Sequence, residues 1–484
     1  MNERFSDEKI NTHKDTLYMS FFDFVSPTLG SLTELAGNKS QTLSSDELIK
    51  SINEKIYELK SNGVFKSKVL LKLENSFTFF IYFFALWELD CLIVPSHPNI
   101  PISLEESLIE CYNIGFVISE QDPIAKHAIQ PSETKPGLLL LTSGTTGVPK
   151  GVLHTEKSIL ARIKSLRGTI PLEEVSRTLC ILPTSFGHGL IGNCLFPLLS
   201  GAHLFVVKQT GLDAIYNLKD ILITHEITFF SSTPSLWNLL FSKLDFHIPD
   251  HFVKRIHCAS APLDKRTFRK IRESFGHSAH VYNIFGMTEL ASWAAFNLCE
   301  DSFESNTIGQ LIEGQFEIRD HLNQPLSCGE TGQLHIKSEC LAGGIYENKQ
   351  FIEFSCNDWF ATGDLCKFLT SKRLVWVARM GNQINRGGIK VYPEEVESLL
   401  MDNPHLESSC CFSIQDPIFG QNIAIAIVLK NGHSLQNAKA WTRRTLSPHK
   451  KPSKWYVLTE IPRNARGKID RIQVRKLALG LVNS

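Results

Sequence analysis

The sequence predicts an α/β protein: a large N-terminal domain of α/β subdomains plus a β-rich subdomain, followed by a small C-terminal α/β domain. Three observations predict this class. Apolar strands and amphipathic helices alternate through about the first 300 residues, glycine turns and short strands begin near residue 306, and a basic composition begins near Gly381. The length of 484 residues is long for one domain, and 43% hydrophobic residues suffice for a sizeable core.

The alternating part begins with a helix over residues 44–60. Leu48, Ile52 and Leu59 lie on one stripe of it, and Ser44 or Ser45 caps it. The run Phe77–Trp87 is too short for a membrane span and is closed by acidic residues, so we expect a buried helix near 76–90. Further helices are expected at 105–111, 156–167 and 190–199, and strands at 69–73, 91–95, 116–119, 178–182, 203–207, 228–231, 255–259 and 280–285.

The C-terminal part differs in charge from the rest of the chain. Residues 382–484 hold fifteen Lys and Arg against eight Asp and Glu, a surplus of seven positive charges; the whole chain has 50 of each, so the remainder is −7. This suggests an acidic or phosphate-rich partner, or simply a solvated basic face. The division predicted is 1–380, with its β-rich subdomain at about 306–380, and 381–484.

Composition excludes several classes of protein. The balanced charge predicts no nucleic-acid or membrane partner, and we expect no membrane span. Twelve cysteines without a C-x-x-C pair argue against zinc ribbons and a disulfide framework and favour reduced thiols. The polar first fifteen residues do not resemble a signal peptide, so a cytoplasmic location is expected.

The segment Leu140–Gly151, LLTSGTTGVPKG, has the chemistry of a phosphate-binding loop. Its glycines allow close approach of the backbone, its hydroxyls and N–H groups can surround phosphate oxygens, and its lysine adds a compact positive charge. It lacks the Gly-Lys-Ser/Thr of the common P-loop. A structural turn between two strands is the alternative. The residues concerned are Thr142, Ser143, Gly144, Thr145, Thr146, Gly147 and Lys150.

Four further segments carry charged or aromatic residues on glycine turns. Each alone is weak, since a turn or a surface ion pair would explain it as well, but the five together in this order are specific. They are YNIFGMTE at 282–289, WFATGD at 359–364, RMGNQINRGG at 379–388 and PRNARGKIDR at 462–471.

With these motifs the sequence resembles the adenylate-forming superfamily, which comprises acyl- and aryl-CoA synthetases, adenylation domains of peptide synthetases and beetle luciferases. The resemblance runs from about residue 40 to the end of the chain. It implies that the C-terminal domain is mobile and rotates between two half-reactions. The first joins a carboxylate to ATP, giving an acyl-adenylate and pyrophosphate, and the second passes the acyl group to a thiol.

The resemblance also implies a role for each matching residue. The loop from Thr142 to Lys150 would hold the β- and γ-phosphates, Lys468 would bridge the attacking carboxylate and the α-phosphate, and no protein nucleophile is needed. The remaining roles are adenine stacking by Phe285 with Gly286 beside it, α-phosphate contact by Thr288, Mg²⁺ binding by Glu289, ribose binding by Asp364, ribose or phosphate contact by Arg379, a wall beside the nucleotide from Ser260, Ala261 and Pro262, and a pantetheine tunnel at Gly388.

Two positions depart from the family pattern. The hinge, where the family carries Asp or Lys, is Gly381 here, and glycine can absorb a large backbone change. A lysine associated with the thiol half-reaction in some members is replaced by Asn385. These departures put the second half-reaction in doubt and motivate an alternative: a non-catalytic acyl- or nucleotide-binding paralogue.

The acyl pocket is expected to include Phe186, Gly187, His188 and Asn283. Gly187 stands where amino-acid-activating members place an aspartate, which argues against α-amino acid substrates because their ammonium would be buried unpaired. His188 could equally be a structural histidine. Residues 187–192 also match G-x-G-x-x-G, but Pro183 interrupts the approach from the preceding strand, so a dinucleotide site is disfavoured.

The function that the sequence predicts is therefore an ATP- and Mg²⁺-dependent acid–thiol ligase (AMP-forming). It would activate an aryl or short to medium acyl acid, and its acceptor would be coenzyme A or the phosphopantetheine of an acyl or peptidyl carrier protein.

Overall fold

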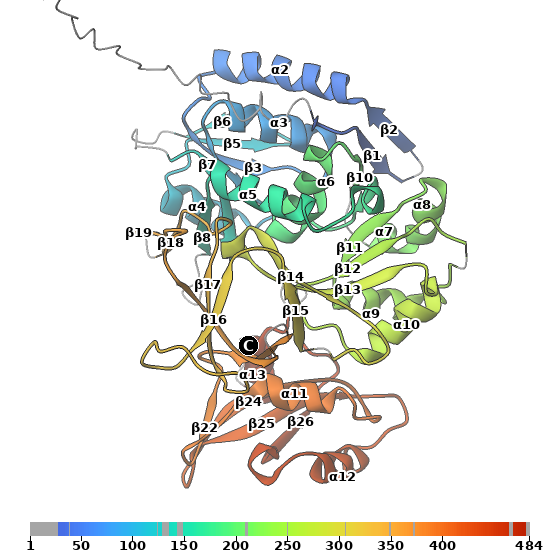
Figure 1. The fold of residues 1–484 in the computed structure, drawn as a ribbon, viewed down its shortest axis with the longest axis vertical. Helices are drawn as coiled ribbons and strands as arrows, with labels where there is room; N and C mark the ends of the chain where they lie inside the picture. The colour runs from blue at the N-terminus through green and yellow to red at the C-terminus, as the bar shows by residue number, and fades with distance from the viewer. Residues whose placement is uncertain are drawn as a thin grey trace, which may run out of the picture.

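The computed structural model describes residues 28–37, 39–122, 124–127, 135–142, 149–208, 212–248, 250–304, 306–347, 350–370, 373–463 and 468–480. These residues form three sheets, and the chain ends in a separate unit at the foot of the molecule (Figure 1). The mixed α/β class predicted from the sequence is confirmed.

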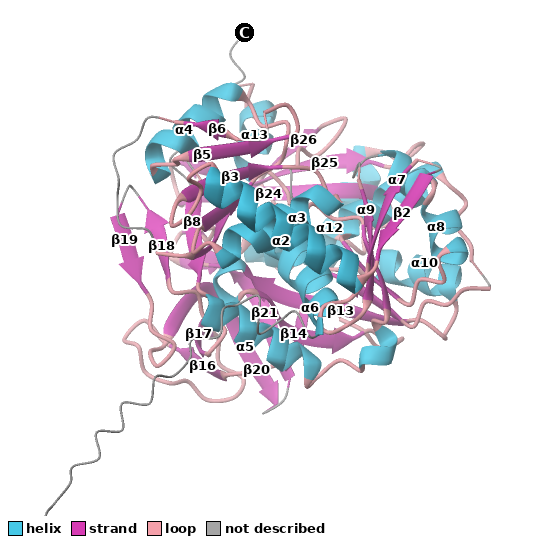
Figure 2. Cartoon of the chain, turned by 90° about the horizontal axis from the view of Figure 1, so that it is seen from above, coloured by secondary structure: helices cyan, strands magenta, loops and turns pink. Residues whose placement is uncertain are grey.

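The eight-stranded sheet has a parallel centre and antiparallel edges, in the order β19-β18-β8-β7-β4-β3-β5-β6. The central strands are β3 (Lys68–Lys72), β4 (Leu92–Pro95), β5 (Phe116–Ser119) and β7 (Gly137–Thr142), and the edges are β6 (Ala125–Lys126), β8 (Lys150–His154), β18 (Gly344–Glu347) and β19 (Gln350–Glu353). Helices α2 (Ser45–Ser61), α3 (Phe77–Glu88) and α4 (Ile102–Tyr112) belong to this part, and α2 packs on α3 (Figure 2).

The parallel half of the thirteen-stranded sheet runs β13-β12-β11-β9-β10-β1, with β2 antiparallel at its edge. Its strands are β1 (Leu32–Ala36), β2 (Lys39–Leu43), β9 (Arg177–Cys180), β10 (His203–Val207), β11 (Phe229–Ser232), β12 (Arg255–Cys258) and β13 (His280–Met287). The helices between these strands are α5 (Glu156–Arg167), α6 (Phe196–Leu199), α7 (Leu212–Tyr216), α8 (Leu218–Thr224), α9 (Pro234–Lys243) and α10 (Lys265–Phe275).

Side-chain alternation along the strands shows that both sheets are covered on both faces. Val69 and Leu71 of β3 enter the same apolar core as Leu204 and Val206 of β10, whereas Leu70 faces an outer core with α4. Helices α3 and α5 contribute to the shared core, so they lie between the two sheets. Because each parallel strand is buried on both sides, its sequence is a continuous apolar run.

The β-rich region continues the thirteen-stranded sheet, in the order β16-β17-β20-β21-β15-β14. Its strands are β14 (Ser292–Leu298), β15 (Thr307–Leu311), β16 (Gln315–Arg319), β17 (Gly332–Lys337), β20 (Phe360–Thr370) and β21 (Arg373–Arg379). The antiparallel strands begin at Ser292, and the limits of the β-rich subdomain at about 306 and 380 stay predictions.

The C-terminal unit is a five-stranded sheet with two apolar cores of its own. It comprises β22 (Ile384–Arg386), β23 (Ile389–Val391), β24 (Leu406–Asp416), β25 (Gly420–Leu429) and β26 (Lys454–Val457), with helices α11 (Pro393–Leu400), α12 (Leu435–Thr445) and α13 (Arg471–Ala478). The boundary at residue 380/381 and the rotation about Gly381 stay predictions.

The helix predicted over 190–199 differs in type and begins earlier. Residues His188–Leu195 form a π-helix, η3, which continues into α6. A Cβ at Gly189 would overlap the Pro183 carbonyl oxygen. A Cβ at Gly192 would lie 2.5 Å from the Trp293 indole. The glycines of this motif are therefore explained by contacts with the protein itself.

Two further expectations concern reduced thiols and membrane-spanning helices. All twelve cysteines carry free thiols. Within the described ranges, no helix combines the length and the apolarity needed to cross a bilayer. The cytoplasmic location stays a prediction.

Candidate active site

The predicted phosphate loop joins the antiparallel strands β7 and β8, in which Thr142 lies opposite Lys150. The residues proposed for phosphate contact between them, Ser143, Gly144, Thr145, Thr146 and Gly147, lie outside the described residues. Lys150 Nζ lies 2.5 Å from Glu347 Oε1 of β18. The Tyr112 hydroxyl donates to the Pro149 carbonyl oxygen at 2.5 Å. Helix α4 thus holds the stem of the loop, and strand β18 supplies a counter-ion to its lysine.

The turn that carries Thr288 and Glu289 is held by its backbone carbonyl groups. His154 Nε2 hydrogen-bonds Thr288 O at 2.7 Å, and the Ala342 N–H donates to Glu289 O at 2.8 Å. Arg162 donates from Nε and Nη2 to Leu290 O at 3.1 and 2.9 Å. Three separate segments therefore fix this turn through the backbone, which leaves the Thr288 and Glu289 side chains available for a ligand.

His154 and Arg162 are fully buried, and sequence analysis missed both. Burial lowers the pKa of His154 to about 4, so the ring is neutral. Burial also lowers the pKa of Arg162. Two of its nitrogens, Nε and Nη2, donate hydrogen bonds to Leu290 O. Neither residue lies in a motif: His154 ends β8 and Arg162 lies on α5, and only tertiary packing brings both to the turn.

Phe285 and Gly286 lie at a β-bulge where β13 pairs with β14. A Cβ at Gly286 would overlap the Ser292 carbonyl oxygen, so the close hairpin requires glycine there. Ala291 and Ser292, with φ of 50° and 86°, complete the turn in the left-handed region. The bulge sets Phe285 and the Thr288–Glu289 turn on one hairpin.

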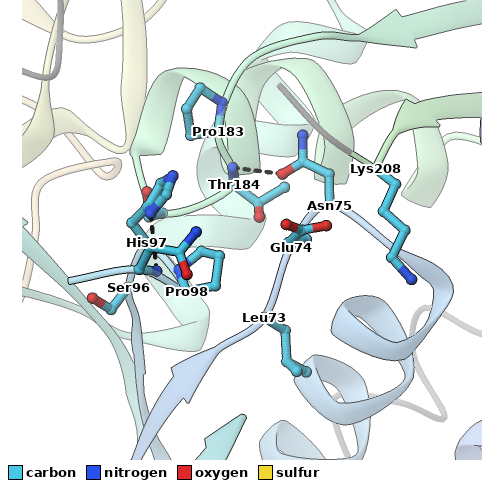
Figure 3. Close-up of a pocket in the computed structure, with 11 residues that line it drawn as sticks. Leu73, Glu74, Asn75, Ser96, His97, Pro98, Pro183, Thr184 and Lys208 are labelled. Carbon is cyan, nitrogen blue, oxygen red and sulfur yellow. Dashed lines mark hydrogen bonds between the residues drawn. The ribbon is translucent and has the colours of Figure 1, made fainter. Parts of the chain in front are cut away.

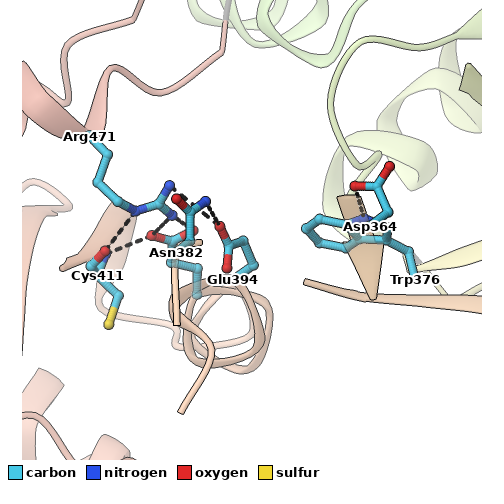
Figure 4. A network of polar contacts seen from close by, with 7 residues as sticks. Asp364, Trp376, Asn382, Glu394, Cys411 and Arg471 are labelled. Atoms are coloured by element: carbon cyan, nitrogen blue, oxygen red, sulfur yellow. Dashed lines mark hydrogen bonds and ion pairs between the residues drawn. The ribbon is translucent and has the colours of Figure 1, made fainter. Parts of the chain in front are cut away.

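Asp364 and Arg379 lie opposite each other on β20 and β21 and form an ion pair. Arg379 Nη1 is 3.0 Å from Asp364 Oδ2. Trp376 Nε1 donates to Asp364 Oδ1 at 3.0 Å (Figure 4). Asp364 is buried, whereas the Arg379 side chain is 48% exposed. A carboxylate held by two donors is fixed in orientation and keeps lone pairs for further hydroxyl donors.

His188 begins the π-helix and is fixed by two hydroxyl groups. Its Nε2 lies 2.6 Å from Ser231 Oγ and its Nδ1 lies 3.1 Å from Ser260 Oγ. Burial lowers the pKa of His188 to about 4, so it is neutral at pH 7. Ser260 holds a φ of 72°. The histidine therefore links the predicted acyl segment to the segment beside the nucleotide, which also holds Ala261 and Pro262.

The other predicted acyl-site residues lie around this helix. A Cβ at Gly187 would meet Leu140 Cδ1 at 3.1 Å and Ser292 Cβ at 4.0 Å, which places Gly187 between strand β7 and the β13–β14 turn. Asn283 is buried, and its amide donates to Thr307 O at 3.4 Å. Phe186 precedes Gly187 and is half-buried. The carboxyl ends of β7, β9, β12 and β13 thus bring these segments together.

Trp293 is a buried component of this region that the sequence did not indicate. Its indole lies edge-on to the rings of His188 and His257, with centroids 6.0 and 4.5 Å apart. Among the described residues, Trp293 Nε1 and the neighbouring Ser292 Oγ are buried without a hydrogen-bond partner. Both are enclosed polar groups whose hydrogen-bonding capacity the described protein leaves unused.

A cavity of about 220 Å³ lies at the carboxyl ends of β3, β4, β9 and β10 (Figure 3). Asn75 crosses from one sheet to the other beside it, donating to Leu182 O at 2.8 Å and accepting from Thr184 N at 3.1 Å. Ser185, next to Phe186, has a buried hydroxyl without a hydrogen-bond partner in the described part of the chain. The cavity therefore adjoins the predicted acyl segment.

Lys468 and Gly388 lie in the C-terminal unit. Lys468 is exposed, and two residues separate it from helix α13. Gly388 has a φ of 88°, and its N–H donates to Asn385 Oδ1 at 3.0 Å. Their approach to the Thr288 turn stays a prediction.

Comparison with known proteins identifies the family. The family described as AMP-binding enzyme matches residues 107–346, and the AMP-binding enzyme C-terminal domain matches residues 395–468. The chain belongs to the AMP-binding enzyme family. The predicted resemblance is thereby confirmed.

Curated relatives of this family member are CoA ligases. The chain is 28% identical over 366 residues to a probable CoA ligase CCL9 of Humulus lupulus, covering 73% of this chain and 68% of the relative. It is 27% identical over 344 residues to an oxalate–CoA ligase of Arabidopsis thaliana, covering 69% and 66%. The matches thus span about two thirds of the relatives' length.

Solved structures share the fold. ATP-bound MatB from Rhodopseudomonas palustris superposes with a TM-score of 0.81 at 17% identity, covering 96% of this chain and 99% of that chain. The MenE O-succinylbenzoate coenzyme A synthetase of Bacillus subtilis with ATP and magnesium gives 0.78 at 22% identity, covering 94% and 99%. The family member therefore has the fold of adenylate-forming enzymes over nearly its whole length.

Proposed function

We propose that this AMP-binding enzyme activates a carboxylic acid with ATP to an acyl-adenylate and then transfers the acyl group to the thiol of coenzyme A. The observation that carries the proposal is the hydrogen bond between His154 Nε2 and Thr288 O at 2.7 Å. His154 lies on β8, the strand that begins at Lys150. Strand β8 thus carries Lys150, the lysine proposed to bind phosphate, at one end, and at its other end His154 contacts the turn with Thr288 and Glu289.

The first half-reaction needs positive charge and fixed donors because a carboxylate attacks a phosphate that already bears negative charge. Lys150 offers an ammonium to the β- and γ-phosphates, Thr288 a hydroxyl to the α-phosphate, and Lys468 an ammonium between the reactants. Asp364 orients the ribose hydroxyls, and Arg379 lies at hydrogen-bond distance from the Asp364 carboxylate. These roles are proposals supported by the family membership and by the geometry of the two turns.

Glu289 fits a magnesium ion. Its turn is fixed through backbone carbonyl groups, and its half-buried side chain makes no ion pair within the described ranges. Magnesium prefers one or two carboxylate oxygens together with substrate phosphates. When bound, the ion would neutralise charge on the phosphates.

The predicted acyl segment is surrounded by polar, uncharged groups: His188 is held neutral, Ser231 and Ser260 contact its ring nitrogens, and the N–H of Trp293 is buried nearby. We infer an aryl or short to medium acyl acid. Curated relatives include oxalate, sulfoacetate and malonate CoA ligases, so doubly charged acids are the direct competitors in a test.

The proposal is tested by acid-dependent exchange of pyrophosphate into ATP, with benzoate, anthranilate, 4-coumarate, octanoate, oxalate, malonate and sulfoacetate as probes. Exchange with at least one aryl or monocarboxylic acid, followed by formation of its CoA thioester, is expected. Binding of ATP without exchange for any acid would contradict the proposal and favour the non-catalytic paralogue. Replacing coenzyme A by a holo carrier protein in the same assay distinguishes the two acceptors.

A further inference from the structure

The loop that carries Lys468 is closed at its base by backbone contacts. Arg463 and Ile469 form an antiparallel bridge, and the Asp470 N–H donates to Pro462 O at 2.9 Å. Asp470 then caps helix α13 by accepting from the Gln473 N–H. Because Lys468 directly precedes Ile469, the position of this base determines the position of the Lys468 backbone.

Arg471, the first residue of α13, fastens that base to the rest of the C-terminal unit. Its Nη2 lies 2.6 and 2.8 Å from the two carboxylate oxygens of Glu397 in α11, and its Nε donates to Cys411 O of β24 at 2.8 Å (Figure 4). The Cys411 N–H donates in turn to Glu397 Oε1 at 2.6 Å. Three elements thus meet at one guanidinium group.

A second carboxylate extends this junction to the predicted hinge. Arg471 Nη1 lies 3.6 Å from Glu394 Oε1, and the same oxygen accepts from Asn382 Nδ2 at 2.6 Å. Asn382 directly follows Gly381, whose φ is 89°. The first residue after the hinge and the residue at the base of the Lys468 loop therefore share one carboxylate.

The junction tolerates little rearrangement because it is buried. The side chains of Glu397 and Glu394 are only 10% and 12% exposed. Burial raises the pKa of Glu397 to about 7, and the charge of Arg471 opposes that rise. Without the guanidinium group a buried carboxylate would lack its counter-ion, which is strongly unfavourable.

We infer that Arg471, with Glu397 and Glu394, is a positioning residue for adenylation: it makes the hinge segment and the Lys468 loop move as one body. The inference rests on the proposed function, because it gives Arg471 its effect through Lys468. In the proposed function Lys468 acts in the first half-reaction, so a defect at the junction is expected to fall on adenylation and to spare thioester formation.

The test uses the full chain with Arg471→Lys and Glu397→Gln, two substitutions that keep most of the side-chain volume. Arg475→Lys, an exposed position one turn later on α13, is the matched control. Pyrophosphate exchange, with the acid most active in the wild type, should lose about 10- to 100-fold in kcat in the first two variants, since small displacements of a reacting group cost that much. In these two variants, the KM for ATP and the rate of thioester formation from supplied acyl-adenylate should stay near the wild-type values. The control variant should match the wild type in both half-reactions.

Two results would overturn the inference. Unchanged exchange in both junction variants would show that Arg471 does not position Lys468. An equal loss in both half-reactions, with a lowered melting temperature, would show a merely structural role. Lys468→Ala separates the proposed function from the inference: if this variant retains exchange, the role of Lys468 itself is wrong.

Discussion

At the scale of single residues, the ammonium group of Lys150 has a counter-ion before any nucleotide arrives. Glu347 Oε1 lies 2.5 Å away, and the two side chains are 30% and 34% exposed. Phosphate oxygens must compete with this carboxylate for the lysine. An ion pair so exposed contributes only about 0.2–1 kcal/mol, so the competition is weak.

Glu347→Gln should therefore lower the KM for ATP by about 1.5- to 5-fold without a loss of kcat. Steady-state kinetics with varied ATP measure this. Glu353→Gln is the control, because Glu353 lies on β19, next to β18, and pairs with Lys135 at 3.2 Å. A higher KM in Glu347→Gln would mean that the carboxylate orients Lys150 rather than competing for it.

His154 makes the stability of the fold depend on pH. Its folded-state pKa of about 4 lies below the value near 6.5 of an unfolded chain. Between these values the unfolded state binds more protons, so stability is full above pH 6.5 and falls as the pH decreases. The contribution of His154 should drop by about 2 kcal/mol from pH 6.5 to 5.0.

His154→Gln should reduce the difference in free energy of unfolding between pH 6.5 and 5.0. Denaturant unfolding at the two pH values gives that difference for wild type and variant. His188 and His257 are shifted in the same direction, so part of the pH dependence persists. An unaltered difference would mean that His154 is charged in the folded protein.

Sequence reasoning found the residues with motifs and missed the residues that hold them. Asp364 and Arg379 were each recognised in a glycine turn, and the strand register pairs them. Glu347, His154 and Arg162 carry no local signal, because each contacts a segment that is distant in the sequence. Such contacts follow from topology and cannot be read from spacing.

At the scale of elements, the π-helix beside the predicted acyl site depends on its glycines, and Gly192 is one of them. A Cβ at Gly192 would lie 2.5 Å from the Trp293 indole, which is itself buried. Most of the parallel strands were predicted within a few residues because their apolar runs are continuous, but β1 was not predicted. The π-helix was expected to be an ordinary helix, since the amphipathic pattern does not reveal what its glycines contact.

Gly192→Ala should destabilise the protein by about 1–3 kcal/mol through overpacking and reduce acid-dependent activity. Thermal unfolding and pyrophosphate exchange measure the two effects. Gly168→Ala at the end of α5 is the control, because its Cβ would meet only ordinary contacts of 3.6 Å or more. Wild-type stability in Gly192→Ala would contradict the packing of Trp293 on this helix.

At the scale of the whole molecule, the proposed function requires the C-terminal unit to change its angle at Gly381. The φ of 89° suits glycine, and no atom lies within 4 Å of a Cβ placed there. Gly381→Ala would strain the backbone without any clash, so its effect falls on the conformation of the hinge.

Gly381→Ala should change the ratio of the two half-reaction rates by about 10-fold, because one domain angle is favoured over the other. Separate assays of pyrophosphate exchange and thioester formation from acyl-adenylate give the ratio. Gly432→Ala carries the same kind of strain, with a φ of 77°, at an exposed turn in the same unit. Equal ratios in both variants would contradict a hinge at Gly381.

The central claim is that this AMP-binding enzyme cleaves ATP between the α- and β-phosphates to form a thioester. The most direct measurement is quantification of nucleotide products by chromatography during turnover with ATP, magnesium, coenzyme A and the most active acid of the panel. The account predicts AMP, pyrophosphate and acyl-CoA in equal amounts. Formation of ADP and phosphate, or AMP without any thioester, would contradict it.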